Sequence, residues 1–326
     1  LHGTNRRQRQ MCIRDSVVPV SKGWSTDPFK ATIKNNKLYG RGSCDMKGFI
    51  ACALAYAPIF SKSNLDRDIN FSFTFDEETA CIGAPLLIKE LKKRGFNKGI
   101  CIVGEPTNMK IIDAHKGAYE YTTYFEGLAG HSSQPHKGVS AVEYAARYVS
   151  KLIELRNELK KRVPKNSIFS PPYSTLSIGG IFGGIAHNVI ADKCHVKWET
   201  RPVVKDDAIF LNAELDKFVN NKLLPEMKKI FPNSSIKKEI IGEIIGFDRD
   251  LKSEACEFVS SITGDNLREV VSFGTEAGLF QEIGISTAVC GPGSIEQAHK
   301  IDEFIELSEI SKCLKFLEGV KEKSTN

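Results

Sequence analysis

Acidic side chains and one histidine recur in this sequence where apolar, strand-like runs end or where glycine and proline form loops. Carboxylates and an imidazole in this combination are typical ligands of a carboxylate-rich zinc centre, and one carboxylate is left over to act as a base. A fold that uses them must bring segments from both ends of the chain together. These segments are Gly40–Gly48, Asp76–Thr79, Gly104–Thr107 and Gln297–Lys300, and they supply Asp45, Glu77, Glu78, Glu105 and His299.

The segments around the first four of these side chains alternate between strand and helix patterns. Alternating apolar and polar residues predict a strand at Ile69–Phe75, and a short apolar run predicts another at Ile100–Val103. The alanine-rich run Phe49–Phe60 and the stretch Ile82–Lys93 predict helices, and Gly95 suits the end of the second helix. Strands that alternate with helices predict an α/β fold with a mostly parallel central sheet, whose sites lie at the carboxyl ends of its strands.

A change of pattern near Lys116 indicates a second domain inserted into the first. Strand, helix, strand, strand, helix and strand patterns follow one another there, which is typical of an α+β sandwich. We therefore expect a lid domain at 117–247 and a catalytic domain at 17–116 and 248–326. The predicted lid elements are strands at Ala118–Glu126, Ser174–Ile178 and His195–Thr200 and helices at Ala141–Leu159 and Asp207–Lys229. The catalytic domain should add a hairpin at Ala31–Tyr39, a helix at 250–263, a strand at Ile285–Cys290 and a helix at Glu303–Glu318.

Composition limits the environments and partners of the chain. Its 326 residues carry a net charge of +5, and much of this excess lies in residues 1–14, so we expect no nucleic-acid surface. Nine cysteines without a Cys-x-x-Cys pair favour a reducing, cytoplasmic compartment over a disulfide framework. No apolar run has the length of a membrane span, and the basic N-terminus has no apolar core of a secretory signal, so we expect no membrane partner.

Each candidate residue also has an ordinary structural interpretation. Asp45 before a helix is more often an N-cap than a ligand, and the pair Glu77–Glu78 is more often a solvated acidic turn. A single histidine such as His299 is more often structural. The metal-site interpretation depends on convergence, because carboxylates that meet at one sheet edge repel each other unless a cation neutralises them.

Three residues of the expected lid domain have the same ambiguity. His131, in Gly-His-Ser-Ser, suits a turn, and Asn188 lies in a similar loop. Arg201 suits either a surface ion pair or a fork that binds a substrate carboxylate. Other enzyme classes are not supported, since the sequence has neither a Gly-x-Ser-x-Gly elbow nor a P-loop, and Gly40-x-Gly42 lacks the third glycine of a dinucleotide site.

Taken together, these motifs resemble the M20 family of zinc aminoacylases and peptidases from residue 17 to the C-terminus. The segments that carry the resemblance are Gly40–Gly48, Asp76–Thr79, Gly104–Thr107, Gly130–Ser133 and His187–Ile190. The resemblance implies two zinc ions, with cobalt as an alternative. Asp45 would bridge them, Glu78 would bind one, and Glu105 and His299 would bind the other. It also implies Glu77 as the general base, His131 as a lid residue that polarises the substrate carbonyl across a homodimer, and Asn188 and Arg201 as substrate-binding residues.

The resemblance implies hydrolysis of the amide of a small N-acyl amino acid. The first expectation is N2-acetyl-L-ornithine, cleaved to ornithine and acetate in arginine biosynthesis. The alternatives are N-succinyl-diaminopimelate or another acyl amino acid. A third alternative belongs to another class: a catalytically dead chain that only dimerises or binds a ligand.

One departure from the family pattern motivates this third alternative. Family members carry Gly-His-x-Asp directly before Val-Val-Pro, and that histidine binds zinc. Counted back from Val17, Arg14 holds the histidine position and Ser16 the aspartate position, and an arginine cannot ligate zinc. Our hypothesis is that residues 1–16 are foreign to the gene and that the chain as written is impaired; the alternative is a divergent, inactive homologue.

Overall fold

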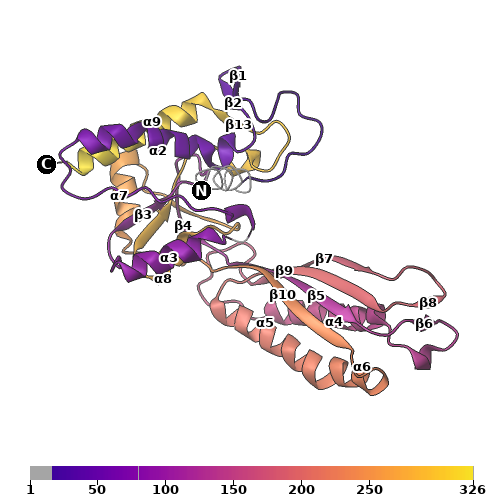
Figure 1. Cartoon of the computed structure of the whole chain (residues 1–326). Coiled ribbons are helices and arrows are strands. Elements are labelled where there is room, and N and C mark those ends of the chain that lie inside the picture. Colours follow the sequence, from indigo (N-terminus) through magenta and orange to yellow (C-terminus); the bar gives the residue numbers. More distant parts are fainter. Residues whose placement is uncertain (1–16, 80, 326) are drawn as a thin grey trace, which may run out of the picture. The chain divides into compact units, whose positions relative to one another are not determined.

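The computed structural model describes residues 17–79 and 81–325, which form two compact units (Figure 1). The first unit contains the residues up to His115, Phe247–Val271 and those from Thr275 onward. The second unit contains Lys116–Gly246 and Ser272–Gly274. No helix in the described ranges is long and apolar enough to cross a membrane.

A four-stranded sheet lies at the centre of the first unit. Its order is β11 (Arg268–Val271), β4 (Ile111–His115), β12 (Ser286–Val289) and β3 (Ile100–Val103). The pairs β11–β4 and β12–β3 are parallel, whereas β12 meets β4 antiparallel. The predicted α/β fold with a mostly parallel sheet is therefore confirmed, although β4 and β11 had no counterpart in the sequence prediction.

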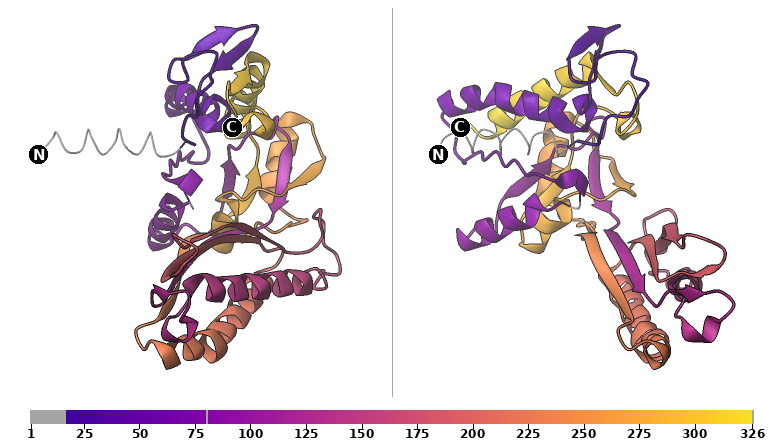
Figure 2. Two further views of the ribbon diagram at one scale, coloured as in Figure 1. Left: turned by 90° about the vertical axis from the view of Figure 1, so that its right-hand side faces the viewer. Right: turned by 45° about the vertical axis from the view of Figure 1, so that its right-hand side comes forward.

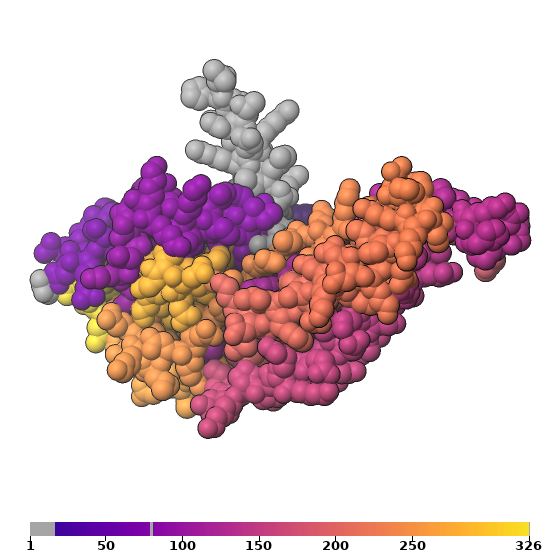
Figure 3. Space-filling model, turned by 90° about the horizontal axis from the view of Figure 1, so that it is seen from below, coloured from indigo at the N-terminus to yellow at the C-terminus, as the bar shows by residue number. Residues whose placement is uncertain are grey.

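Helices cover both faces of this sheet. On one face, α2 (Gly48–Lys62), α7 (Glu254–Thr263) and α9 (Leu307–Lys323) bury apolar side chains against β3, β4 and β12 (Figure 1). On the other face, α3 (Gly83–Lys93) packs against α8 (Ala277–Glu282), and the two helices lie at the surface in purple and gold (Figure 3). Gly95 ends the α3 segment with φ +78, as its place after the helix predicts.

A small antiparallel sheet joins the beginning of the first unit to its end. The predicted hairpin is present as β1 (Thr32–Lys34) and β2 (Lys37–Tyr39), and both turn residues, Asn35 and Asn36, have positive φ, which asparagine tolerates. β13 (Phe304–Glu306) pairs with β2. The prediction of a helix from Glu303 was therefore wrong at its start, because residues 304–306 are recruited as a strand and α9 begins at Leu307.

The strand predicted at Ile69–Phe75 is not formed. Its alternation does place Ile69 and Phe71 toward apolar partners, and the Phe71 ring lies 6.0 Å from that of Phe60. A strand also needs a hydrogen-bonded neighbour, and within residues 17–79 and 81–325 β3 at the sheet edge pairs only with β12. The Phe75 carbonyl instead accepts a bond from the Gly83 N–H at the start of α3.

The second unit is an antiparallel sheet covered by helices. Its order is β10 (Ser235–Ile244), β5 (Ala118–Glu126), β9 (Lys193–Arg201) and β7 (Thr175–Gly183). Both α4 (Ala141–Leu159) and α5 (Lys205–Phe218), which continues through a π-turn into α6 (Leu224–Ile230), lie on one face of it (Figure 2). The core includes a stacked pair, Tyr121 and Trp198, whose ring centroids are 4.4 Å apart. A separate two-stranded antiparallel sheet is formed by β6 (Gly130–His131) and β8 (Val189–Ile190).

Candidate metal centre

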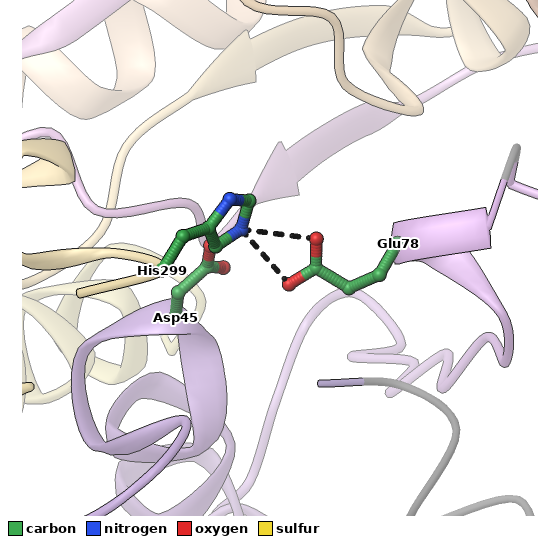
Figure 4. Close-up of side chains that lie close together, drawn as sticks. All are labelled: Asp45, Glu78 and His299. Carbon is green, nitrogen blue, oxygen red and sulfur yellow. Dashed lines mark hydrogen bonds and ion pairs between the residues drawn. The ribbon is translucent and has the colours of Figure 1, made fainter. Parts of the chain in front are cut away.

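Asp45, Glu78 and His299 come together in the first unit from three distant parts of the chain. Each offers one ligand atom, and these atoms lie within 4.8 Å of one another. The Nε2 atom of His299 lies 3.1 Å from Glu78 Oε2 and 3.4 Å from Asp45 Oδ2 (Figure 4). Two carboxylates and one imidazole whose ligand atoms lie this close together match the oxygen and nitrogen donors that zinc takes in catalytic sites.

Asp45 lies in an irregular turn between β2 and α2. The turn spans Ser43–Lys47, and Asp45 has φ −116 and ψ 96, which is not helical. Lys47 occupies the N-cap position of α2, without a side-chain capping bond. The N-cap interpretation of Asp45 is therefore wrong, and its carboxylate is directed to the His299 side chain instead.

The pair Glu77–Glu78 forms a short 3-10 turn that ends at Thr79. Burial is the main cause that raises the pKa of Glu77 to about 8, and the charges of Glu78, Asp45 and Glu276 add to it. Burial also raises the pKa of Glu78 to about 7, with Asp45 as the next cause. This pair is thus not a solvated acidic turn, because its carboxyls are held where negative charge is unfavourable.

The pKa values of Glu105 and His299 are also raised by the charges around them. Glu105 follows β3 and is 7% exposed, and burial, Glu77 and Asp45 raise its pKa well above the usual value. The hydrogen bond to Asp45 raises the pKa of His299 to about 9, and the charge of Glu78 adds to this. In the described part of the chain, the group within 4.8 Å includes neither Glu77 nor Glu105. Their carboxyls nevertheless act on that group through charge, so a cation here would relieve repulsion among all of them.

Glu276 is an acidic residue of this region that the sequence analysis missed. It is 8% exposed and lies directly before α8. Its Oε2 accepts a bond of 2.9 Å from the Thr74 hydroxyl, while its Oε1 has no hydrogen-bond partner among the described residues. Its charge raises the pKa of Glu77 and of Glu105. Glu276 follows the parallel strand β11, as Glu105 follows β3. That position would have indicated a site residue, but β11 was not predicted from the sequence.

The other candidate residues belong to the second unit. His131 is exposed in β6, and its Nδ1 lies 2.8 Å from the hydroxyl of Ser133. Asn188 lies in the adjoining loop, where its backbone carbonyl accepts a hydrogen bond of 3.1 Å from the Ser132 N–H. Arg201, at the end of β9, forms an ion pair of 2.8 Å with Glu199. The structure thus brings His131 and Asn188 into one corner and gives Arg201 an ordinary ion pair within its own strand.

Arg14 and Ser16 fall outside the described ranges. Arg14 and Ser16 occupy the positions where the family pattern has a zinc-binding histidine and its aspartate. Both lie in the segment 1–16, which precedes the first described residue, Val17. The hypothesis that this segment is foreign stays a prediction.

Comparisons with known proteins identify the family to which the chain belongs. The family model of peptidase family M20/M25/M40 matches residues 15–323. The chain is 35% identical to acetylornithine deacetylase of Photorhabdus laumondii, over 94% of this chain and 77% of that protein. It is 36% identical to acetylornithine deacetylase of Erwinia tasmaniensis, over 90% of this chain and 74% of that protein. Among solved structures, an M20 family metallo-carboxypeptidase from Sulfolobus solfataricus superimposes with a TM-score of 0.67 at 19% identity, over 94% of this chain and 82% of that one.

Proposed function

Because this chain belongs to peptidase family M20/M25/M40, we propose that it is a metallohydrolase that cleaves the amide of N2-acetyl-L-ornithine to ornithine and acetate. The names and identities of the relatives from Photorhabdus laumondii and Erwinia tasmaniensis support this substrate. The proposal places the reaction in arginine biosynthesis. The free cysteines of the described residues, most of them buried, suit a reducing cytoplasm.

The observation that carries this proposal is the convergence of Asp45, Glu78 and His299 within 4.8 Å. The donor set fits zinc or cobalt: Asp45, Glu78 and His299 would hold one ion, and Glu105 would contribute to a second. We thus assign His299 to the ion of Glu78 and not to that of Glu105, which corrects the expectation from the resemblance, because His299 Nε2 lies 3.1 Å from Glu78 Oε2. A bound dication supplies Lewis acidity and a water that deprotonates near neutral pH.

Glu77 is the residue we assign as general base. Without a metal, burial and the neighbouring carboxylates raise its pKa to about 8. A bound dication would lower this pKa from that raised value, toward the range in which a carboxylate both accepts and returns a proton. In the proposed reaction its carboxylate takes a proton from the attacking water. The same proton then goes to the amide nitrogen as the C–N bond breaks, which leaves acetate and the free amine of ornithine.

The second unit supplies the proposed substrate contacts. We assign His131 to the substrate carbonyl and Asn188 and Arg201 to the substrate's polar groups. Arg201 already pairs with Glu199 at 2.8 Å, so a substrate carboxylate would share or replace that partner. We also propose that the chain forms a homodimer through this unit, so that one His131 serves the neighbouring copy.

Parallel assays with zinc or cobalt test this function. We expect hydrolysis of N2-acetylornithine, measured as free ornithine, to exceed hydrolysis of N-succinyl-diaminopimelate. A faster rate on the succinyl substrate would select that alternative. Binding of metal with neither substrate cleaved would favour the catalytically dead alternative, and a variant in which Gly-His-x-Asp replaces residues 13–16 would show whether Arg14 and Ser16 are the cause.

A further inference from the structure

The carboxylate of Glu303 accepts four hydrogen bonds from the loop that carries Asp45. Its Oε2 accepts from Arg41 Nη1 at 2.8 Å and from the Gly42 N–H at 2.9 Å. Its Oε1 accepts from the N–H groups of Cys44 at 2.9 Å and of Asp45 itself at 3.1 Å. Charge-assisted bonds of this kind are stronger than bonds between neutral groups, so the loop is tied firmly to this one side chain.

The backbone of Glu303 holds the same loop from the other side. Its carbonyl accepts bonds from the Gly40 N–H at 3.0 Å and from the Ser43 hydroxyl at 3.4 Å. The next residue, Phe304, begins β13, which pairs with β2 directly before the loop. Because Glu303 follows His299 by four positions, it connects the loop of the histidine to the loop of Asp45.

Arg41 makes this buried carboxylate tolerable. Glu303 is 1% exposed and Arg41 is 5% exposed, so neither charge has water as a partner. An unpaired charge at such depth costs several kcal/mol, whereas a carboxylate that is paired and accepts several hydrogen bonds, as that of Glu303 does, persists. The guanidinium of Arg41 also lies 5.1 Å from the ring centroid of Trp24, a cation–π contact, while its Nε has no hydrogen-bond partner among the described residues.

We propose that Glu303 and Arg41 are positioning residues that fix Asp45 opposite His299 and thereby set the metal affinity of the site. The inference rests on the proposed function in one respect, namely that Asp45 and His299 are metal ligands. Asp45 has non-helical dihedrals, so the turn needs an external acceptor for its N–H groups. Without the carboxylate of Glu303, the N–H groups of Gly42, Cys44 and Asp45 lose that acceptor, and the turn reorganises with Asp45 in it.

Three variants of the full chain test the inference. Glu303→Gln keeps the shape of the side chain but replaces one acceptor oxygen with a donor that faces N–H groups. Arg41→Lys keeps the buried positive charge and loses the planar fork. Glu306→Gln is the matched control, since Glu306 is an exposed glutamate of the adjoining strand β13. Cobalt affinity and the visible absorption spectrum of bound cobalt are measured, together with hydrogen exchange of the Gly42, Cys44 and Asp45 amides.

We expect Glu303→Gln to weaken cobalt binding by about 10–100-fold, to change the cobalt spectrum and to accelerate exchange of the three amides. Arg41→Lys should have a smaller effect in the same direction, and Glu306→Gln should stay within about twofold of the unaltered chain. In activity assays the loss should fall on kcat more than on KM, because the substrate contacts lie elsewhere.

The inference is overturned if Glu303→Gln remains folded and binds cobalt as tightly as Glu306→Gln does. If Glu303→Gln does not fold, Arg41→Lys decides by the same comparison of cobalt affinity. The proposed function fails separately, when the unaltered chain binds cobalt yet leaves both acyl amino acids intact.

Discussion

Buried polar groups differ between the core of the second unit and the acidic edge of the first unit. The acidic edge consists of Asp45, Glu77, Glu78, Glu105 and Glu276. In the second unit, Trp198 Nε1 donates to Thr123 Oγ1 at 3.1 Å, and that hydroxyl lies in a ladder of regular strands. In the first unit, Glu77 is half-buried and Glu105 is buried beside other carboxylates, and the pKa values of both are raised. Satisfied polar groups stabilise a fold, whereas clustered like charges destabilise it until a cation binds.

This contrast separates the parts of the chain that build the fold from the part that does chemistry. The site accepts unfavourable charge because its loops are anchored by contacts such as those of Glu303. We therefore expect substitutions at the acidic edge to change activity without loss of stability, and substitutions in the second unit's core to do the reverse.

The largest effect should come from Glu77→Gln. Removing the proposed base should lower kcat by about 10²–10⁴-fold, because the attacking water loses its proton acceptor. The melting temperature should stay the same or rise, since a buried like charge disappears. Initial rates and thermal unfolding measure the two effects, with the exposed Glu120→Gln of the second unit as control. A variant that keeps more than a tenth of the activity would argue against Glu77 as the base.

For the core of the second unit, the corresponding test is Leu152→Ala in α4, which should lower stability and leave the metal site unchanged. Leu152 is 0% exposed in the core of the second unit, and its truncation should lower the free energy of unfolding by about 2–5 kcal/mol. Metal affinity should not change, because the proposed ligands lie in the other unit. Urea unfolding and cobalt titration measure both quantities. Glu154→Ala, an exposed position on the same helix, should stay within about 0.5 kcal/mol, and an equal loss there would contradict the packing argument.

The third prediction concerns pH in protein stripped of metal with a chelator. The folded-state pKa values of Glu77, Glu78 and His299 are about 8, about 7 and about 9, all raised above ordinary values. The folded chain therefore binds more protons than the unfolded chain, so stability is greatest below about pH 5 and falls as pH rises toward 9. Melting temperatures across this range measure the decline, and added zinc should reverse it. A stability that rises from pH 5 to 8 without metal would contradict the acidic cluster.

The same contrast explains what could be predicted from the sequence. The strand Ala118–Glu126 and the helix Ala141–Leu159 agree with the structure at both ends, because side-chain periodicity reports burial on a regular element. At Ile69–Phe75 the same periodicity was present, but a strand also requires a pairing partner, which local pattern does not reveal.

The site was only partly predictable for a related reason. The residue types at Asp45, Glu78 and His299 indicated metal chemistry, and the structure brings these three together. Glu276 and Glu303 were missed because their roles depend on contacts across the chain. Glu303 lies 258 positions from Asp45, whose N–H it accepts, and no local pattern in either segment signals that bond.

The smallest effect should come from Glu276→Gln, which tests how far the acidic edge extends. After burial, Glu78 and Asp45, the charge of Glu276 is a lesser cause of the raised pKa of Glu77. Its removal should lower that pKa, so the acidic limb of the profile of kcat/KM against pH should move to lower pH by less than about one unit. Glu269→Gln, at an exposed glutamate paired with Lys110, should leave the limb in place. A shift to higher pH would show that Glu276 acts on Glu77 through structure rather than through charge, since loss of a negative neighbour can only make a carboxyl more acidic.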